Sequence, residues 1–223
     1  TQRNLSLDVE KPLLAERFSE EDYSTACIST NAWLSRKFGL TEGFDLVNNL
    51  SSDGLSEKLS KIRRGMDDWL AEPGNERLKR LVVRLGNSLF HYWNGGSQTE
   101  KVLEKGREFI SENRRFFLFM NLMDAHEPYF PPEKYRQKHE APEPREICQD
   151  PTDYHFGRKQ PDFEAVNRIY DASVDYMDDM LGEFFDHLKQ EGLWEETVVV
   201  VTSDHGQMLG ENYQGRRVYD VLR

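Results

Sequence analysis

Two short stretches of the sequence place an acidic residue and a histidine soon after an apolar run. Asp204 and His205 follow the run at 197–201, and Asp124 and His126 follow the run at 116–123. Carboxylate oxygens and imidazole nitrogens are common ligands for divalent metal ions, and a histidine can donate a proton to charge that develops on a leaving oxygen. One such stretch is as typical of a turn as of a metal site, but two of them favour a site that performs chemistry.

The apolar runs predict the strands that would position these residues. Residues 198–201 are four valines in succession, which is typical of a strand buried on both faces inside a parallel sheet. In open α/β sheets ligands sit beyond the carboxyl ends of the strands, so this strand would deliver Asp204 and His205 to the ligand-binding rim. Residues 116–123 predict a second buried strand, and Asp124 is expected to stabilise the turn before His126 rather than to bind a metal.

Helical patterns alternate with these strands along the chain. We predict a further strand at 23–30, helices at 7–22, 98–113 and 163–190, and weaker amphipathic helices within 50–92. This order of elements predicts an α/β fold, a three-layer α/β/α sandwich with a mainly parallel sheet. Residues 1–223 would form one domain, with a helical insertion at 46–97 and a proline-rich loop at 130–161 near the active-site face. His139, in that loop, is expected to be solvated.

Composition limits the classes of partner. The 223 residues carry a formal net charge of −11, with 37% hydrophobic and 31% charged residues. This negative charge argues against nucleic acid or an anionic membrane as the main partner, and no apolar run reaches the roughly 18 residues that a transmembrane helix needs. Cys27 and Cys148 alone do not make a disulfide framework. The first residue is Thr1 rather than Met, so the compartment stays open, with a leaning to the cytoplasm; the oligomeric state is not predicted.

A longer pattern resembles a known family. It is strongest within and after the long predicted helix, in Tyr170-Asp171-Ala172-Ser173-Val174, Gly192-Leu193-Trp194, Thr202-Ser203-Asp204-His205-Gly206 and Leu209-Gly210-Glu211. Earlier matches are Tyr23-Ser24-Thr25-Ala26, Gly43-Phe44-Asp45 and His126-Glu127-Pro128-Tyr129. Together these motifs resemble the sulfatase family of the alkaline phosphatase-like superfamily, over nearly the whole chain. The resemblance implies an alkaline phosphatase-like fold, here incomplete at both ends.

The resemblance implies a role for each matching residue. Asp204 and His205 match a pair of metal ligands, and His126 matches the histidine that contacts the sulfuryl or phosphoryl oxygens near the leaving group. Asn31 is the polar residue near the position of the family's substrate-binding Lys and His, and Arg216 would fill a later basic position. The implied cofactor is one divalent metal ion, calcium in the first place, with magnesium, manganese or zinc as alternatives.

The chain also departs from the family pattern. The family's nucleophile sits in a Cys/Ser-x-Pro/Ala-Ser-Arg motif, and neither Cys27 nor Cys148 lies in one, so formylglycine is not encoded here. The nucleophile and an Asp-Asp pair of metal ligands are expected upstream of Thr1.

The function that the resemblance implies is metal-dependent hydrolysis of sulfate esters of small molecules or glycans. This chain would be the central part of such an enzyme and inactive alone. One alternative is a phosphodiester or phosphonate hydrolase, or a phosphotransferase, of the same superfamily, which the sequence Asp204-His205 in place of Asp-Asn mildly favours. Another is a non-catalytic member.

Overall fold

The structure is a computed structural model, and it divides the chain into two compact units. Unit 1 comprises Thr1–Met123 and unit 2 comprises Asp124–Arg223. The residues that it describes are 11–31, 33–50, 98–144, 162–213 and 216–222. Each unit is described by itself.

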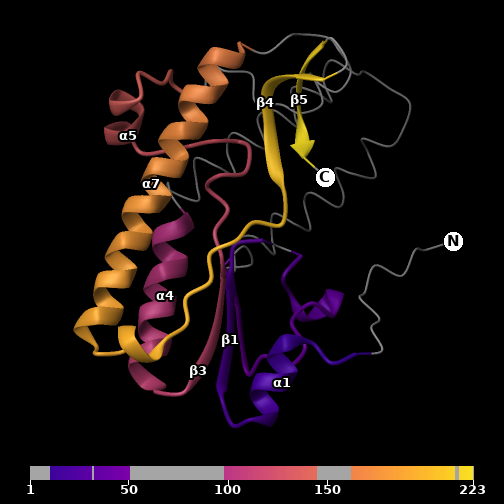
Figure 1. The fold of residues 1–223 in the computed structure, drawn as a ribbon, viewed down its shortest axis with the longest axis vertical. Helices are drawn as coiled ribbons and strands as arrows, with labels where there is room; N and C mark the ends of the chain where they lie inside the picture. The colour runs from indigo at the N-terminus through magenta and orange to yellow at the C-terminus, as the bar shows by residue number, and fades with distance from the viewer. Residues whose placement is uncertain (1–10, 32, 51–97, 145–161, 214–215, 223) are drawn as a thin grey trace, which may run out of the picture. The chain divides into compact units, whose positions relative to one another are not determined.

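Unit 1 is built on a parallel sheet of three strands. β1 (Ser24–Ser29) lies between β2 (Leu46–Asn49) and β3 (Phe116–Asn121), and all neighbours are parallel (Figure 1). Ala26 and Ile28 on β1 are fully buried, as expected for a strand that is paired on both edges and covered on both faces. The sequence therefore predicted β1 correctly, and the parallel sheet confirms the predicted α/β fold.

β3 is a strand where one was predicted, but it is less buried than expected. Its residues are partly exposed, and 39% of Phe119 is accessible. The described part of the chain gives β3 one strand neighbour, β1. One edge of β3 and part of its surface therefore remain open within unit 1.

Two helices pack against this sheet. α1 (Leu14–Glu20) contacts β1, and Phe18 stacks on Phe117 of β3 with ring centroids 4.5 Å apart. α4 (Gln98–Glu112) contacts β1 and β3 and buries an apolar face that includes Val102, Leu103, Phe109 and Ile110. α4 confirms the helix predicted at 98–113. α1 confirms part of the helix predicted at 7–22, whose first residues lie outside those described.

The loop between β1 and β2 is fixed to β1 through Thr25. The Asp45 carboxylate accepts a hydrogen bond from the Thr25 backbone N–H (2.9 Å), and the Thr25 hydroxyl donates to the Gly43 carbonyl (2.8 Å). Gly43 has a φ of +80°, and a side chain there would collide with the backbone of Glu16. β2 was not predicted; it occupies the start of the segment predicted as an insertion at 46–97, and residues 51–97 lie outside the described ones.

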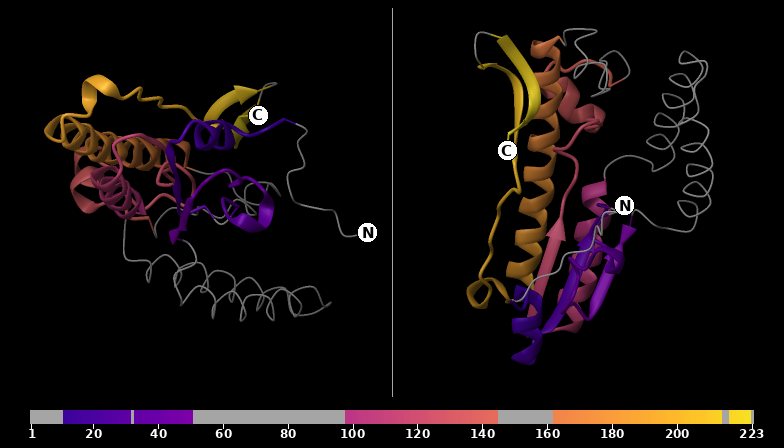
Figure 2. Two further views of the ribbon diagram at one scale, coloured as in Figure 1. Left: turned by 90° about the horizontal axis from the view of Figure 1, so that it is seen from below. Right: turned by 90° about the vertical axis from the view of Figure 1, so that its right-hand side faces the viewer.

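Unit 2 is organised around α7 (Phe163–Gln190), a helix of 28 residues. Asp162 caps its N-terminus by accepting from the Ala165 backbone N–H (3.1 Å), and Gly192, with a φ of +69°, follows its C-terminus. The short helix α5 (Glu133–Lys138) lies beside α7 (Figures 1 and 2). α7 confirms the predicted long helix. The loop predicted at 130–161 is helical at α5, and residues 145–161 of it lie outside the described part.

An antiparallel hairpin completes unit 2. β4 (Gly206–Tyr213) pairs with β5 (Arg216–Leu222), with Gly206 opposite Leu222. The hairpin lies against the N-terminal part of α7 (Figures 1 and 2). The 3-10 helix η3 (Trp194–Glu196) follows α7 and precedes residues 197–205, which form neither helix nor strand. None of the described helices combines the length and apolar character needed to cross a membrane.

The buried strand predicted at 197–201 is wrong. These residues form neither helix nor strand and pair with no strand among the described ones (Figure 1), and 90% of Val198 and 77% of Val200 are exposed. β-branched residues favour an extended backbone, but a buried strand also needs neighbours that bond its edges and cover its faces. The valines supply the preference for an extended backbone, but the described structure supplies no neighbouring strand.

Candidate active site

Unit 2 brings together the three residues for which chemistry was predicted. The imidazole rings of His126 and His205 lie with their centroids 6.3 Å apart, inclined at 68°. His205 Nε2 lies 3.8 Å from Oδ1 of Asp204, whose side chain is 88% exposed. Residues separated by most of unit 2 in the sequence are therefore neighbours.

In both histidines, ring atom Nδ1 is hydrogen-bonded to a backbone carbonyl oxygen. His126 Nδ1 lies 2.6 Å from the Glu127 carbonyl oxygen, and His205 Nδ1 lies 2.9 Å from the Gly206 carbonyl oxygen. A carbonyl oxygen only accepts, so Nδ1 carries the hydrogen in each ring and Nε2 carries the lone pair of the neutral form. This is the arrangement in which a histidine ligates a metal or exchanges a proton through Nε2.

One apolar core lies behind both histidine loops. Tyr129, three residues after His126, is fully buried, and Leu209, four residues after His205, is 6% exposed. Both belong to a cluster with the N-terminal part of α7, formed by Phe163, Ala165, Val166 and Ile169. Burying a side chain of this size contributes about 1.5–3 kcal/mol. The N-terminal part of α7 is therefore the common support of the two loops.

The donors present fit part of a divalent-metal site. Asp204 offers carboxylate oxygens and His205 offers Nε2, which together suit borderline and hard divalent ions. Within the described ranges, no group of three or more His, Cys, Asp or Glu side chains could hold a metal ion. Two buried side-chain atoms near the histidines have no hydrogen-bond partner among the residues described. They are Oε2 of Glu127, next to His126, and Nε2 of Gln207, close to His205. Buried polar atoms of this kind are commonly paired by water, an ion or a ligand.

The other two residues predicted to bind substrate are Asn31 in unit 1 and Arg216 in unit 2. Asn31 belongs to unit 1, where its side-chain oxygen accepts from the Trp33 backbone N–H (3.0 Å) and so closes a turn. Arg216 lies at the turn end of the hairpin, opposite Tyr213, whereas Gly206 beside His205 lies at the other end, opposite Leu222. Seven residues of β4 separate these ends, or roughly 23 Å at about 3.3 Å per residue.

Cys27 is unsuited to the role of nucleophile. It is a free thiol on β1 with 1% of its surface exposed. Burial raises the pKa of Cys27 to about 11, so the thiol is protonated at neutral pH. Since the thiolate is the reactive form, Cys27 is a core residue. Cys148 lies outside the described residues.

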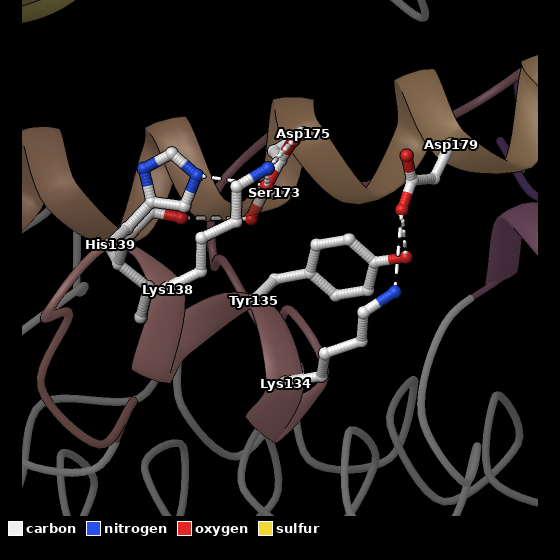
Figure 3. Close-up of polar contacts among 8 residues, drawn as sticks. Lys134, Tyr135, Lys138, His139, Ser173, Asp175 and Asp179 are labelled. Carbon is white, nitrogen blue, oxygen red and sulfur yellow. Dashed lines mark hydrogen bonds and ion pairs between the residues drawn. The ribbon is translucent and has the colours of Figure 1, made fainter.

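A polar network that was not predicted joins α5 to α7 (Figure 3). Asp175 accepts from Lys138 Nζ (2.7 Å) and lies 3.0 Å from His139 Nε2, and Asp179 accepts from the Tyr135 hydroxyl (2.8 Å). The prediction that His139 is solvated is wrong, because its ring is bound to Asp175 and only 27% of its side chain is exposed. The signal available in the sequence was the matched spacing of Lys134 with Lys138 and of Asp175 with Asp179, each four residues apart.

The network shifts the pKa values of three of its members. The hydrogen bond from Lys138, with a second from His139, lowers the pKa of Asp175, and the hydrogen bond to Asp175 raises the pKa of Lys138. Burial, with the hydrogen bond to Asp179, raises the pKa of Tyr135 to about 12. Each shift favours the protonation state that holds the network together.

Comparisons with known proteins identify the same family as the motifs. The Sulfatase family model matches residues 6–220. The chain is 28% identical over 130 residues to a choline-sulfatase of Rhizobium meliloti (strain 1021), a match that covers 50% of this chain and 25% of that protein.

Two further relatives match more of this chain. A multifunctional alkaline phosphatase superfamily protein, PehA of Trinickia caryophylli, is 25% identical over 183 residues, covering 66% of this chain and 34% of the relative. An ulvan-active sulfatase of Formosa agariphila is 26% identical over 220 residues, covering 94% and 38%.

The matches to individual relatives are partial, whereas the family model covers almost the whole chain. The chain spans between a quarter and two fifths of the length of these relatives, and no solved structure matches it. The family model, however, covers all but a few residues at each end. The chain belongs to the sulfatase family.

Proposed function

We propose that the protein containing this chain hydrolyses sulfate esters and that unit 2 supplies part of its active site. The observation that carries the proposal is the convergence of His126 and His205, with ring centroids 6.3 Å apart, beside the exposed carboxylate of Asp204. Family membership supports the reaction class. Two relatives support the bond cleaved, since one is named a choline-sulfatase and the other an ulvan-active sulfatase.

Asp204 and His205 are proposed as two ligands of a divalent metal ion, with calcium as the first candidate. Such an ion, when bound, polarises the ester oxygens and stabilises the negative charge that develops on them. The carbonyl of Gly206 holds His205 Nδ1, which leaves Nε2 directed to the site of ligation. The exposure of Asp204 leaves its oxygens accessible to the same ion.

His126 is proposed to carry the proton of the reaction. In hydrolysis the bond from sulfur to the alcohol oxygen breaks, an oxygen that comes from water bonds to sulfur, and the alcohol oxygen takes up a proton. His126 in its protonated form would donate that proton from Nε2 and recover one from water. The Glu127 carbonyl, which accepts from Nδ1 at 2.6 Å, fixes the orientation of the ring.

A phosphoryl ester is the second candidate substrate. The specific observation in its favour is the imidazole of His205. It would give the metal a nitrogen donor at the position where many family members have the carboxamide oxygen of an asparagine. The match to a multifunctional alkaline phosphatase superfamily protein points in the same direction. Sulfate and phosphate esters share the tetrahedral, anionic group that this site would bind.

The test is turnover by the full-length protein that contains this chain. The metal-depleted protein is assayed with para-nitrophenyl sulfate and bis(para-nitrophenyl) phosphate, before and after Ca²⁺ or Mn²⁺ is restored. We expect metal-dependent release of nitrophenol, faster from the sulfate. His126→Ala should lower kcat by about 10²–10⁴-fold, the usual contribution of a general acid.

His139→Ala is the matched control, because it removes another histidine of unit 2 that lies in the α5–α7 network. It should leave kcat close to that of the wild type, because the His139 ring contacts Asp175. Absence of metal-dependent turnover of either ester refutes the proposed function. Equal losses in His126→Ala and His139→Ala would refute the role of His126.

A further inference from the structure

We propose that Asn167 is the positioning residue for His205, a role that rests on the proposed function. Asn167 lies one turn into α7, and its side-chain Nδ2 donates to two carbonyls. One is Phe163 in the first turn of its own helix (2.6 Å), and the other is Leu209 on β4 (2.7 Å). Both partners can only accept, so both amide hydrogens are used and the orientation of the carboxamide is fixed.

Leu209 is the point at which β4 is anchored. Its side chain is buried in the core that also holds Tyr129, and its backbone N–H donates to the Glu211 carboxylate. The pairing with β5 shifts by one residue between Leu209 and Glu211, and Gly210 adopts a φ of +114°. Such a β-bulge interrupts the regular ladder and redirects the strand. Asn167 therefore binds the carbonyl beside an irregularity in β4, where a side-chain donor can replace a ladder contact.

A short and continuous path leads from this anchor to the imidazole of His205. β4 begins at Gly206, three residues before Leu209, or about 10 Å along an extended strand. The Gly206 carbonyl accepts from His205 Nδ1 at 2.9 Å and so sets the direction of Nε2. Any movement of β4 along α7 would carry the Gly206 carbonyl and the ring of His205 with it. Asn167 opposes that movement through a bond that joins residues 42 positions apart.

The apolar core does not provide the same restraint. Contacts among Leu209, Tyr129 and Ile169 hold β4 close to α7, but apolar contacts have little directional preference. A hydrogen bond weakens steeply when its angle departs from linearity. The core therefore sets the distance between β4 and α7, and Asn167 sets the register.

The experiment compares Asn167→Ala and Asn167→Asp with the wild type in the full-length protein. Asn167→Asp keeps the shape of the side chain and replaces the donor by oxygen. Ser173→Ala is the matched control. Its hydroxyl donates to the Ile169 carbonyl (3.1 Å) on the same helix, so this variant also loses a bond to a helix carbonyl but none to β4.

Three quantities are measured: the dissociation constant for Mn²⁺ by calorimetry, kcat and KM for para-nitrophenyl sulfate, and amide hydrogen exchange in peptides that cover 204–211. Both Asn167 variants should weaken Mn²⁺ binding and lower kcat by about tenfold, the lower end for partners that orient a metal ligand. KM should change less than kcat, and exchange in 204–211 should become faster. Ser173→Ala should match the wild type in all three.

Three outcomes overturn the inference, and they remain distinguishable. If the wild type turns over the ester and binds Mn²⁺, while the Asn167 variants match Ser173→Ala, only the role of Asn167 is refuted. If the wild type neither binds Mn²⁺ nor turns over the ester, the proposed function is refuted, and the role of Asn167 toward His205 with it. Faster exchange with unchanged Mn²⁺ affinity and kcat would make Asn167 a structural residue only, which also refutes the proposal.

Discussion

α7 holds a partner at each of two places, and it does so by different means. At its N-terminal part, β4 and the His126 loop are held by an apolar core and by the uncharged carboxamide of Asn167. Further along, α5 is held by Asp175 and Asp179, which bind lysine, histidine and tyrosine side chains (Figure 3). Among these bonds, the attachment that supports the candidate site contains no titratable contact to α7, whereas the attachment of α5 includes several.

This difference has a physical consequence. Hydrogen bonds between neutral groups and apolar contacts do not change with the protonation of the protein or with the salt concentration. Ion pairs depend on both. We therefore expect the geometry of His126 and His205 to survive conditions that loosen α5.

The largest expected effect comes from the two buried tyrosines, one at each attachment. Tyr129 is fully buried in the core behind the histidines, and Tyr135 is 5% exposed in a cluster with Ala172 and Tyr176. Replacing either by alanine should lower the free energy of unfolding by about 3–5 kcal/mol, as for other large aromatic residues in cores. Only Tyr129→Ala should also weaken Mn²⁺ binding. Urea denaturation and calorimetry measure the two effects, and equal weakening of Mn²⁺ binding by both variants would contradict the separation.

A smaller effect is expected from the Tyr135 hydroxyl. Tyr135→Phe removes the hydrogen bond to Asp179 and should cost about 1–2 kcal/mol at neutral pH. Because folding raises the pKa of Tyr135 from 10.0 to about 12, its stabilisation is complete below pH 10 and is lost as the pH rises toward 12. Lys138, whose pKa is also raised, loses its contribution in the alkaline range as well.

Denaturation between pH 8 and 12 checks the tyrosine prediction. The wild type should lose stability more steeply than Tyr135→Phe, and the two should converge at the alkaline end. Parallel curves would show that the hydroxyl does not titrate with folding. The catalytic parameters of Tyr135→Phe at neutral pH should equal those of the wild type.

Asp175 should act at the opposite end of the pH scale. Its pKa is lowered from 3.8, so its stabilisation is present above that value and is lost as the pH falls through the lower, folded value. Asp175→Asn should cost at most about 1 kcal/mol at neutral pH, the upper end for accessible ion pairs. Acid titration of the two proteins should show this difference vanish at low pH. A difference that persists after Asp175 is protonated would argue against an ionic origin.

The smallest effect is expected at the edge of the network. Lys134 Nζ lies 3.5 Å from Asp179, and its side chain is 76% exposed. Lys134→Gln should change the free energy of unfolding by less than about 0.5 kcal/mol, because water and salt screen such a pair. A loss as large as that of Tyr135→Phe would show that the charge of Asp179, rather than its bond to the hydroxyl, attaches α5.

Two apolar runs show how far sequence reasoning could go. Ala26-Cys27-Ile28 and the four valines at 198–201 both predict buried strands, and only the first forms one. The pattern reports a preference for extended backbone, whereas burial depends on strands contributed by distant parts of the chain. α7 was predictable to its end residues because Asp162 and Gly192 mark its ends locally.

The candidate site was predictable only where local sequence motifs mark its residues. His126 and His205 follow apolar runs, and their motifs indicated chemistry at both positions. The structure places their rings 6.3 Å apart. Asn167 was not predictable, since its partner is a backbone carbonyl at a bulge. The α5–α7 network left a spacing signal in the sequence, but α5 lies inside an expected loop. Arg216 was proposed only through the family resemblance, and the pattern gave no sign of the hairpin that carries it.

The most direct test of the central claim uses Mn²⁺ as a paramagnetic probe in the full-length protein with labelled histidines. If Asp204 and His205 bind the ion beside His126, one equivalent should broaden the imidazole resonances of both His205 and His126. The resonances of His139 should broaden less, because its partner Asp175 lies about 12 Å further along α7 than Asn167 at about 1.5 Å per residue. Sharp His126 resonances at saturating Mn²⁺, or equal broadening of all three histidines, would contradict a shared site at the N-terminal part of α7.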